Sequence, residues 1–108
     1  MNIGQITKMA QQMQTQMAQA QEELKQTTLE ASAGGGAVRI VITGAQEVRS
    51  IEIDPSAIDP AEAEMLQDLV MTAINDAIGR SKELERERMG RIAGGMGLPG
   101  MPGLPGLG

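Results

Sequence analysis

Residues 38–53, VRIVITGAQEVRSIEI, determine the fold of this chain. From Val38 to Thr43 apolar and other side chains alternate, which is the period-two pattern of a strand with one buried face. Gly44-Ala45 marks a tight turn, and the alternation resumes from Val48 to Ile53. The stretch therefore predicts a hairpin of two strands.

The sequence also predicts a β-bulge within this hairpin and a third strand before it. Ile51 and Ile53 share one face of their strand, whereas Val48 has the wrong parity for that face, so we expect a β-bulge near Arg49. A weaker alternation over 29–33 predicts a short strand that ends at the glycine triplet 34–36. The triplet precedes a strand rather than a helix and lacks the Lys-Ser/Thr pair of a phosphate-binding loop, so we interpret it as a hairpin linker.

Long amphipathic helical patterns flank the three strands. The first runs from about Ile3 to Thr27, and the second runs from Pro60 to about Met89, with Asp59-Pro60 as a typical helix start. The apolar stripe of the first helix consists of Ile3, Ile6, Met9, Met13, Met17, Ala20 and Leu24. The predicted buried side of the second consists of Met65, Leu66, Leu69, Val70, Ala73, Ile74, Ala77 and Ile78. Beyond these residues we expect its second half to project into solvent.

The predicted helices are longer than the sheet they flank. At 1.5 Å per residue they span roughly 37 and 45 Å, whereas strands of this kind reach about 17–20 Å. Apolar stripes must therefore extend past the sheet, and a second copy of the chain is the simplest way to cover them. We predict a homodimer whose interface includes Ile6, Met9, Met13, Met17, Leu69 and Ile74.

The composition excludes several function classes. The 108 residues contain no His, Cys, Trp, Tyr or Phe. The chain therefore lacks the usual general acid–base, thiolate and imidazole or thiolate metal-ligand chemistry, and no serine has a base partner in a recognised motif. Glu52, Asp54 and Asp59 are better explained as strand-end and helix-cap residues than as metal ligands. We expect no enzymatic activity, no metal, no cofactor, no signal peptide and no membrane span, and hence a cytoplasmic protein.

Charge is distributed unevenly along the chain, whose net charge is −5. Acidic residues dominate 47–68, whereas 80–91 holds five basic and three acidic residues. This basic run has two interpretations: a solvated helix with Glu–Arg pairs, or a surface that contacts nucleic acid. Without aromatic side chains to stack on bases, the nucleic acid would be duplex DNA held by its backbone. The candidate phosphate-binding residues are Arg80, Lys82, Arg86, Arg88 and Arg91, with Lys8 and Lys25 as weaker candidates.

Several segments, in one register, resemble the YbaB/EbfC family of nucleoid-associated proteins. These are MAQQMQ at 9–14, QEEL at 21–24, the glycine triplet before VRIVI, IEIDP at 51–55, EMLQDLV at 64–70, NDA at 75–77 and LPG at 98–100. The resemblance implies an α+β fold of order α-β-β-β-α, in which two long helices flank a small antiparallel sheet. It also implies a tweezer-like homodimer that binds duplex DNA in the bacterial nucleoid.

We therefore expect residues 1–90 to form a DNA-binding and dimerisation domain and residues 91–108 to form a disordered Gly/Pro-rich tail. The function we expect is that of a nucleoid-associated homodimer, which holds duplex DNA mainly through phosphate contacts, organises the nucleoid and influences gene expression. The alternative is an adaptor that docks a protein partner through its Met-rich and Gln-rich faces or its Pro/Gly tail and binds DNA only incidentally.

Overall fold

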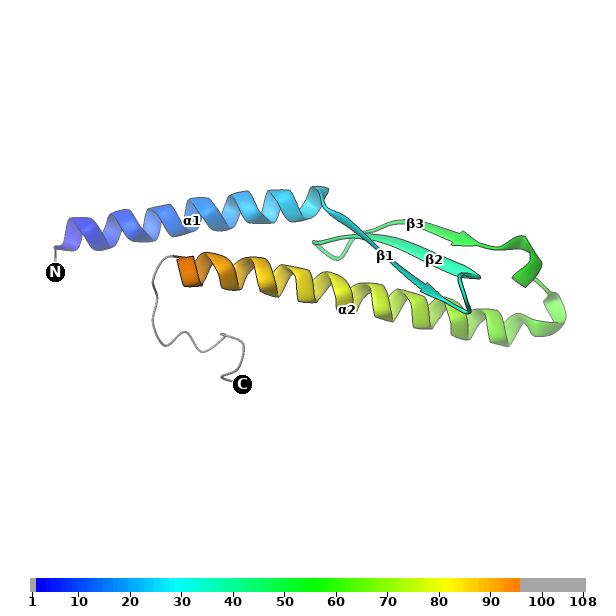
Figure 1. The fold of residues 1–108 in the computed structure, drawn as a ribbon. Coiled ribbons are helices and arrows are strands. Elements are labelled where there is room, and N and C mark those ends of the chain that lie inside the picture. The colour runs from blue at the N-terminus through cyan, green and yellow to red at the C-terminus, as the bar shows by residue number, and fades with distance from the viewer. Residues whose placement is uncertain (1, 96–108) are drawn as a thin grey trace.

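The computed structural model describes residues 2–95. Helix α1 (Ile3–Gln26) is followed by strands β1 (Thr28–Ala33), β2 (Val38–Thr43) and β3 (Val48–Ile53) and by helix α2 (Ala63–Gly95), with two short 3₁₀ turns between β3 and α2. The predicted α-β-β-β-α order is confirmed. In Figure 1, α2 lies along the sheet, while α1 and the C-terminal half of α2 extend together beyond it.

The three strands form an antiparallel sheet in the order β1-β2-β3. In the second hairpin, Val41 pairs with Ser50 and Ile42 pairs with Val48, so Arg49 is the extra residue of a β-bulge. The bulge that the parity of Val48 predicts is confirmed. It restores Val48 to the face of the sheet that carries Ile51 and Ile53.

The core lies between α2 and the inner face of β1 and β2. Its buried members are Ala31, Val38, Ile40, Ile42, Ala73 and Ala77. The two helix alanines have no side chain beyond Cβ, which lets the helix backbone approach the strands closely. Met65, which the sequence places on the buried side, is 56% exposed, because helical geometry puts it roughly 100° around the axis from these alanines.

Helix α2 ends at Gly95, six residues beyond the predicted end at Met89. Arg91-Ile92-Ala93 continues the helix because none of the three is a helix breaker, and Gly90 alone costs only about 1 kcal/mol. Residues 91–95 therefore belong to the helix rather than to the tail; the rest of the predicted tail, 96–108, lies outside the described residues. The second half of α2 is also not purely a solvated projection, since it packs beside α1.

The C-terminus of α1 is joined to the β2–β3 turn at Gly44. The Gly44 N–H lies 2.9 Å from both the Leu24 and the Thr27 carbonyl oxygens, to which it donates. A Cβ at Gly44 would lie 2.7 Å from Leu24 Cδ2 and 3.1 Å from the Leu24 carbonyl oxygen. Leu24 is completely buried, so glycine is required here for the close approach of helix and turn.

The same turn is joined to α2 by a buried hydroxyl. Ser81 Oγ donates to the Thr43 carbonyl oxygen at 2.6 Å and accepts from the Gln46 backbone N–H and side-chain Nε2 at 3.1 and 3.0 Å. Gln46 adopts a φ of 61°, a left-handed conformation that costs a non-glycine residue energy. The β2–β3 turn thus fixes both long helices relative to the sheet.

We predict that Gly44→Ala lowers the free energy of unfolding by about 1–3 kcal/mol, because the added methyl group must displace Leu24 or the helix backbone. Thermal unfolding followed by circular dichroism at 222 nm measures the change. Gly79→Ala is the matched control: its Cβ meets nothing within 4 Å, and we expect it to raise stability by about 1 kcal/mol. Equal stability of the two variants would contradict the close-packed joint.

Candidate nucleic-acid interface

The basic residues of α2 lie on two sides of the helix. Arg80 and Arg91 are eleven residues apart, about three turns, and share one side of the helix, while Arg88 lies roughly 60–80° around the axis from them. Lys82 and Arg86, one turn apart, lie on the roughly opposite side. The predicted run is therefore a helix with cations on two sides, and it does not present a single basic face.

Acidic neighbours hold several of these cations. Arg80 Nε lies 3.0 Å from Asp76 Oδ2, and Arg86 Nη1 lies 3.0 Å from Glu83 Oε2. On α1, Lys25 Nζ lies 3.7 Å from Glu22 Oε2. All three pairs are well exposed, and exposed pairs contribute only about 0–1 kcal/mol. A DNA phosphate can therefore replace the carboxylate at little cost.

Arg88 differs from the other cations because it links the two helices. Its Nη1 lies 3.6 Å from Glu23 Oε2 on α1, and its side chain is only 29% exposed. Within residues 2–95, it is the single ion pair that joins α1 to α2. Arg88 therefore holds the helices together in addition to being a candidate phosphate ligand.

Lys82, Arg91 and Lys8 are exposed and form no ion pair within residues 2–95. Lys82 and Arg91 extend the cationic part of α2. Lys8 lies fifteen residues before Glu23, roughly 22 Å along α1 from the contact with Arg88. The structure therefore brings Lys25 close to the α2 cations and leaves Lys8 apart from them.

Sequence reasoning missed one cation near Lys25. Arg49, the extra residue of the bulge, donates from Nη2 to the Lys25 carbonyl oxygen at 3.2 Å and pairs with Glu47 at 3.4 Å. A cation at the C-terminal end of α1 complements the helix dipole. The predicted bulge was the signal that this side chain is redirected, but only the fold shows that it reaches α1.

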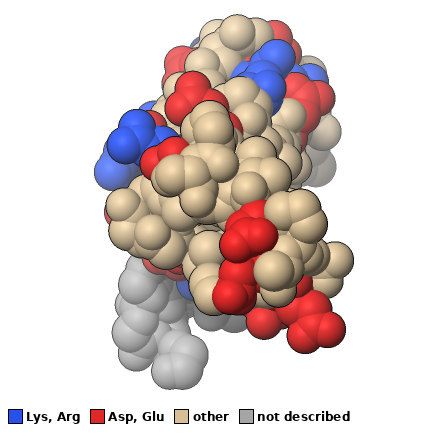
Figure 2. All heavy atoms as spheres, turned by 90° about the vertical axis from the view of Figure 1, so that its right-hand side faces the viewer, with Lys and Arg blue, Asp and Glu red and all other residues tan. Residues whose placement is uncertain are grey.

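The opposite end of the molecule is acidic. No Lys or Arg occurs between Arg49 and Arg80. Figure 2 looks at this sheet end and shows Asp and Glu side chains at its centre and lower right, with Lys or Arg side chains toward its left and upper edges. The exposed carboxylates of the segment are Glu52, Asp54, Asp59, Glu62, Glu64, Asp68 and Asp76. Hydrogen bonds from the backbone and side chain of Ser56 lower the pKa of Asp54, so this carboxyl stays ionised at neutral pH.

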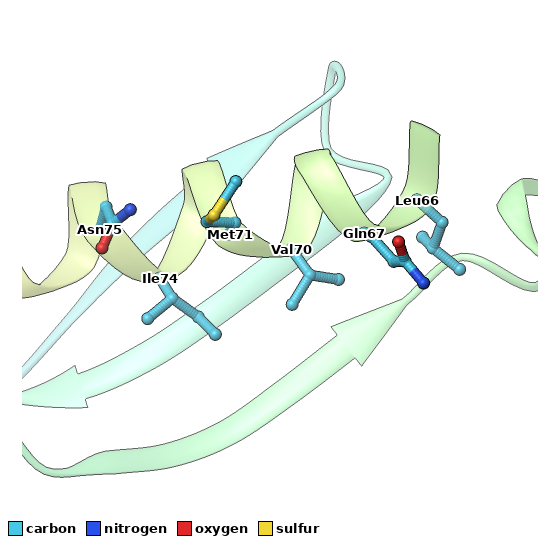
Figure 3. Close-up of a pocket in the computed structure, with 6 residues that line it drawn as sticks. All are labelled: Leu66, Gln67, Val70, Met71, Ile74 and Asn75. Carbon is cyan, nitrogen blue, oxygen red and sulfur yellow. The ribbon is translucent and has the colours of Figure 1, made fainter. Parts of the chain in front are cut away.

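An apolar trough lies on the flank of α2. It has a volume of about 450 Å³ and is lined by Leu66, Gln67, Val70, Met71, Ile74 and Asn75. Figure 3 shows Leu66, Val70 and Ile74 along one side of the helix. Among the predicted interface residues, Leu69 and Ile74 are both half-buried against the core of their own chain, and Ile74 also lines this trough. Ile6, Met9 and Met17 are exposed, and Met13 is half-buried.

The structure shows neither a metal site nor a membrane-spanning helix in the part that it describes. Residues 2–95 contain no group of three or more acidic side chains placed to hold a metal ion. None of the helices in that range is long and apolar enough to cross a bilayer.

Comparison with known proteins identifies the family. The model of the YbaB/EbfC DNA-binding family matches residues 1–96. A nucleoid-associated protein of Chloroflexus aurantiacus is 50% identical over 96 residues, covering 89% of this chain and 96% of the relative. One of Acetivibrio thermocellus is 48% identical over 96 residues, covering 89% and 85%.

A solved structure supports the same assignment. The crystal structure of uncharacterized protein HP0035 from Helicobacter pylori matches with a TM-score of 0.72 and 26% identity, covering 81% of this chain and 91% of the other. The resemblance seen in the sequence is confirmed, and the family is one of DNA-binding proteins rather than of enzymes. The chain belongs to the YbaB/EbfC DNA-binding family.

Proposed function

We propose that this protein binds duplex DNA as a homodimer, mainly through phosphate contacts, and acts in the cytoplasm at the nucleoid, where it organises DNA and influences gene expression. The nucleoid-associated relatives support this role. The observation that carries it is the exposure of cations on two sides of α2, at the end of the molecule remote from the acidic sheet end. We place the phosphate contacts at Arg80, Lys82, Arg86, Arg88, Arg91 and Lys25, with Lys8 as an outlying contact.

Charge separation lets an acidic protein bind DNA. The exposed carboxylates of 52–76 repel phosphates from the sheet end. A duplex is therefore directed to the helical arms, which are α1 and the C-terminal half of α2 beyond the sheet. Arginine and lysine on two sides of α2 follow no pattern that could read one base sequence, which favours contacts with the backbone. Dimerisation doubles the number of such contacts on one duplex.

A second copy is the best candidate to cover the open half of the sheet. Val48 and Ile51 face the same side as the buried residues of β2, yet they are 41% and 46% exposed, because α2 lies over β1 and β2. The neighbouring trough on α2 has an uncharged rim formed by Gln67 and Asn75. Two molecules of net charge −5 can approach most easily at such a neutral surface.

We predict that Ile51→Asp shifts the protein from dimer to monomer, because a carboxylate would be buried in the apolar interface. Sedimentation velocity with interference optics measures the mass without needing aromatic absorbance. Ile58→Asp adds the same charge at a residue that is 58% exposed outside the trough, and we expect it to leave the dimer intact. A monomeric wild type, or a dimeric Ile51→Asp variant, would contradict this interface.

For DNA binding, we predict that log affinity falls linearly with log salt concentration, by about 0.9 for each phosphate neutralised. Fluorescence anisotropy of a labelled random-sequence duplex at several salt concentrations gives the slope. The adaptor alternative, in which a protein partner docks and DNA binding is only incidental, is favoured by the ion pairs that already engage Arg80, Arg86, Arg88 and Lys25. No binding at low salt, or a slope near zero, would support that alternative.

Replacing Arg86 and Arg88 by Glu should weaken binding to all duplex sequences alike and reduce the magnitude of the salt slope by about 3.6, since the dimer loses two phosphate contacts from each copy at about 0.9 per contact. Arg39→Glu, compared with Arg86→Glu alone, is the matched control, because each changes the charge of one chain by two and Arg39 lies on the sheet, outside α2. Equal losses in these two single variants would mean that net charge alone governs binding.

A further inference from the structure

The apolar stripe of α1 is covered at one end and open at the other. Met9, Met13, Met17, Ala20 and Leu24 fall within roughly 80° of one another around the helix, on one continuous line. Exposure is lowest beside the sheet and highest at the N-terminus: Leu24 is 0%, Ala20 7%, Met17 39%, Met9 43%, Ile6 48% and Ile3 80% exposed, with Met13 half-buried between Met17 and Met9. We call Ile6, Met9, Met13 and Met17 the open row of α1.

The open row begins where the partner helix stops. The contact between Arg88 and Glu23 aligns α2 with α1 in opposite directions. From Arg88 to Gly95 is seven residues, roughly 10 Å, which places the end of α2 beside the region of Met17. Beyond that point α1 continues without α2 alongside it (Figure 1).

The chain itself supplies a candidate cover at this place. Residues 96–108, MGLPGMPGLPGLG, follow directly from Gly95 and lie outside the described residues. Leu98, Met101, Leu104 and Leu107 recur at every third position. A polyproline II segment has three residues per turn, so in that conformation these four side chains would share one side.

Length and composition agree with this match. Thirteen residues in polyproline II conformation reach roughly 40 Å, whereas Met17 and Ile6 are roughly 16 Å apart along α1. Neither the open row nor segment 96–108 contains an acidic residue, so no charge has to be buried. A tethered segment also has an effective concentration in the millimolar range, which favours it over a separate molecule.

We propose that segment 96–108 docks on the open row of α1, with Leu98, Met101 and Leu104 against the methionines. This contact is independent of DNA and goes beyond the proposed function, and it assigns Ile6, Met9, Met13 and Met17 to the chain's own segment in place of the dimer interface expected from the sequence. It gives the Leu-Pro-Gly repeats a specific binding surface within the same chain. Methionine suits such a surface because its flexible thioether adapts to an irregular partner.

The rate of methionine oxidation tests this proposal. Dilute hydrogen peroxide converts an exposed thioether to the sulfoxide, with release of water, and peptide mass spectrometry measures the initial rate at each methionine. We expect Leu98→Ser/Leu104→Ser to accelerate oxidation of Met9 and Met17 several-fold relative to the wild type. Met65, which lies at the sheet end outside the trough and is 56% exposed, should react at an unchanged rate and serve as the internal reference.

Two further comparisons decide between occupants. Gly100→Ser/Gly106→Ser introduces the same residue into the same segment away from the apolar positions, and it should leave Met9 and Met17 protected. Protection should also be independent of protein concentration. Unchanged Met9 and Met17 rates in Leu98→Ser/Leu104→Ser would overturn the proposal. Protection that rises with concentration would assign the open row to a second copy and would overturn it as well.

Discussion

One helix covers only part of a three-stranded sheet, and much of this structure follows from that limit. An α-helix with its side chains is about 10–12 Å wide, whereas neighbouring strands are about 4.8 Å apart. Helix α2 therefore covers β1 and β2, where Val38, Ile40 and Ile42 are completely buried. The matching side chains of β3, Val48 and Ile51, remain open. The fold thus leaves an apolar surface for another molecule as a direct result of its small size.

A second constraint lies at the β2–β3 turn, which joins three elements in a small volume. Because Gly44 has no side chain, the end of α1 can lie directly against the turn and accept hydrogen bonds from the Gly44 N–H. On the other side, the buried Ser81 hydroxyl of α2 donates a hydrogen bond to the Thr43 carbonyl oxygen of the turn. The helices therefore leave the sheet in a fixed relation and extend past it side by side (Figure 1). Because both attachments use backbone groups, the arrangement depends on a few small residues rather than on a large core.

The order of elements could be predicted from the sequence because each element carries its own local signal. Even the bulge at Arg49 followed from the parity of a single residue, Val48. The exposed Met65 and the extension of α2 to Gly95 could not be predicted as well, because apolar character does not fix the angle around a helix and isolated glycines do not end one. The pairing of Arg88 with Glu23 was also hidden, since these residues are far apart in sequence and meet only when α1 and α2 pack.

The candidate DNA interface shows why net charge is a poor guide to partners. The excess of acidic residues is concentrated in 52–76, and in the proposed function it would repel phosphates from the sheet end. In the C-terminal half of α2, Arg80 pairs with Asp76 and Arg86 pairs with Glu83, each about one turn away. Such pairs are weak in water, and DNA carries a far denser array of negative charge along its backbone. In the proposed binding mode, DNA phosphates would therefore replace these intrahelical carboxylates at little cost. Arg88 is the exception, because it pairs with Glu23 of α1. A phosphate that replaced Glu23 at Arg88 would remove the ion pair between α1 and α2, and would therefore loosen the contact between the two helices as well as neutralise the arginine.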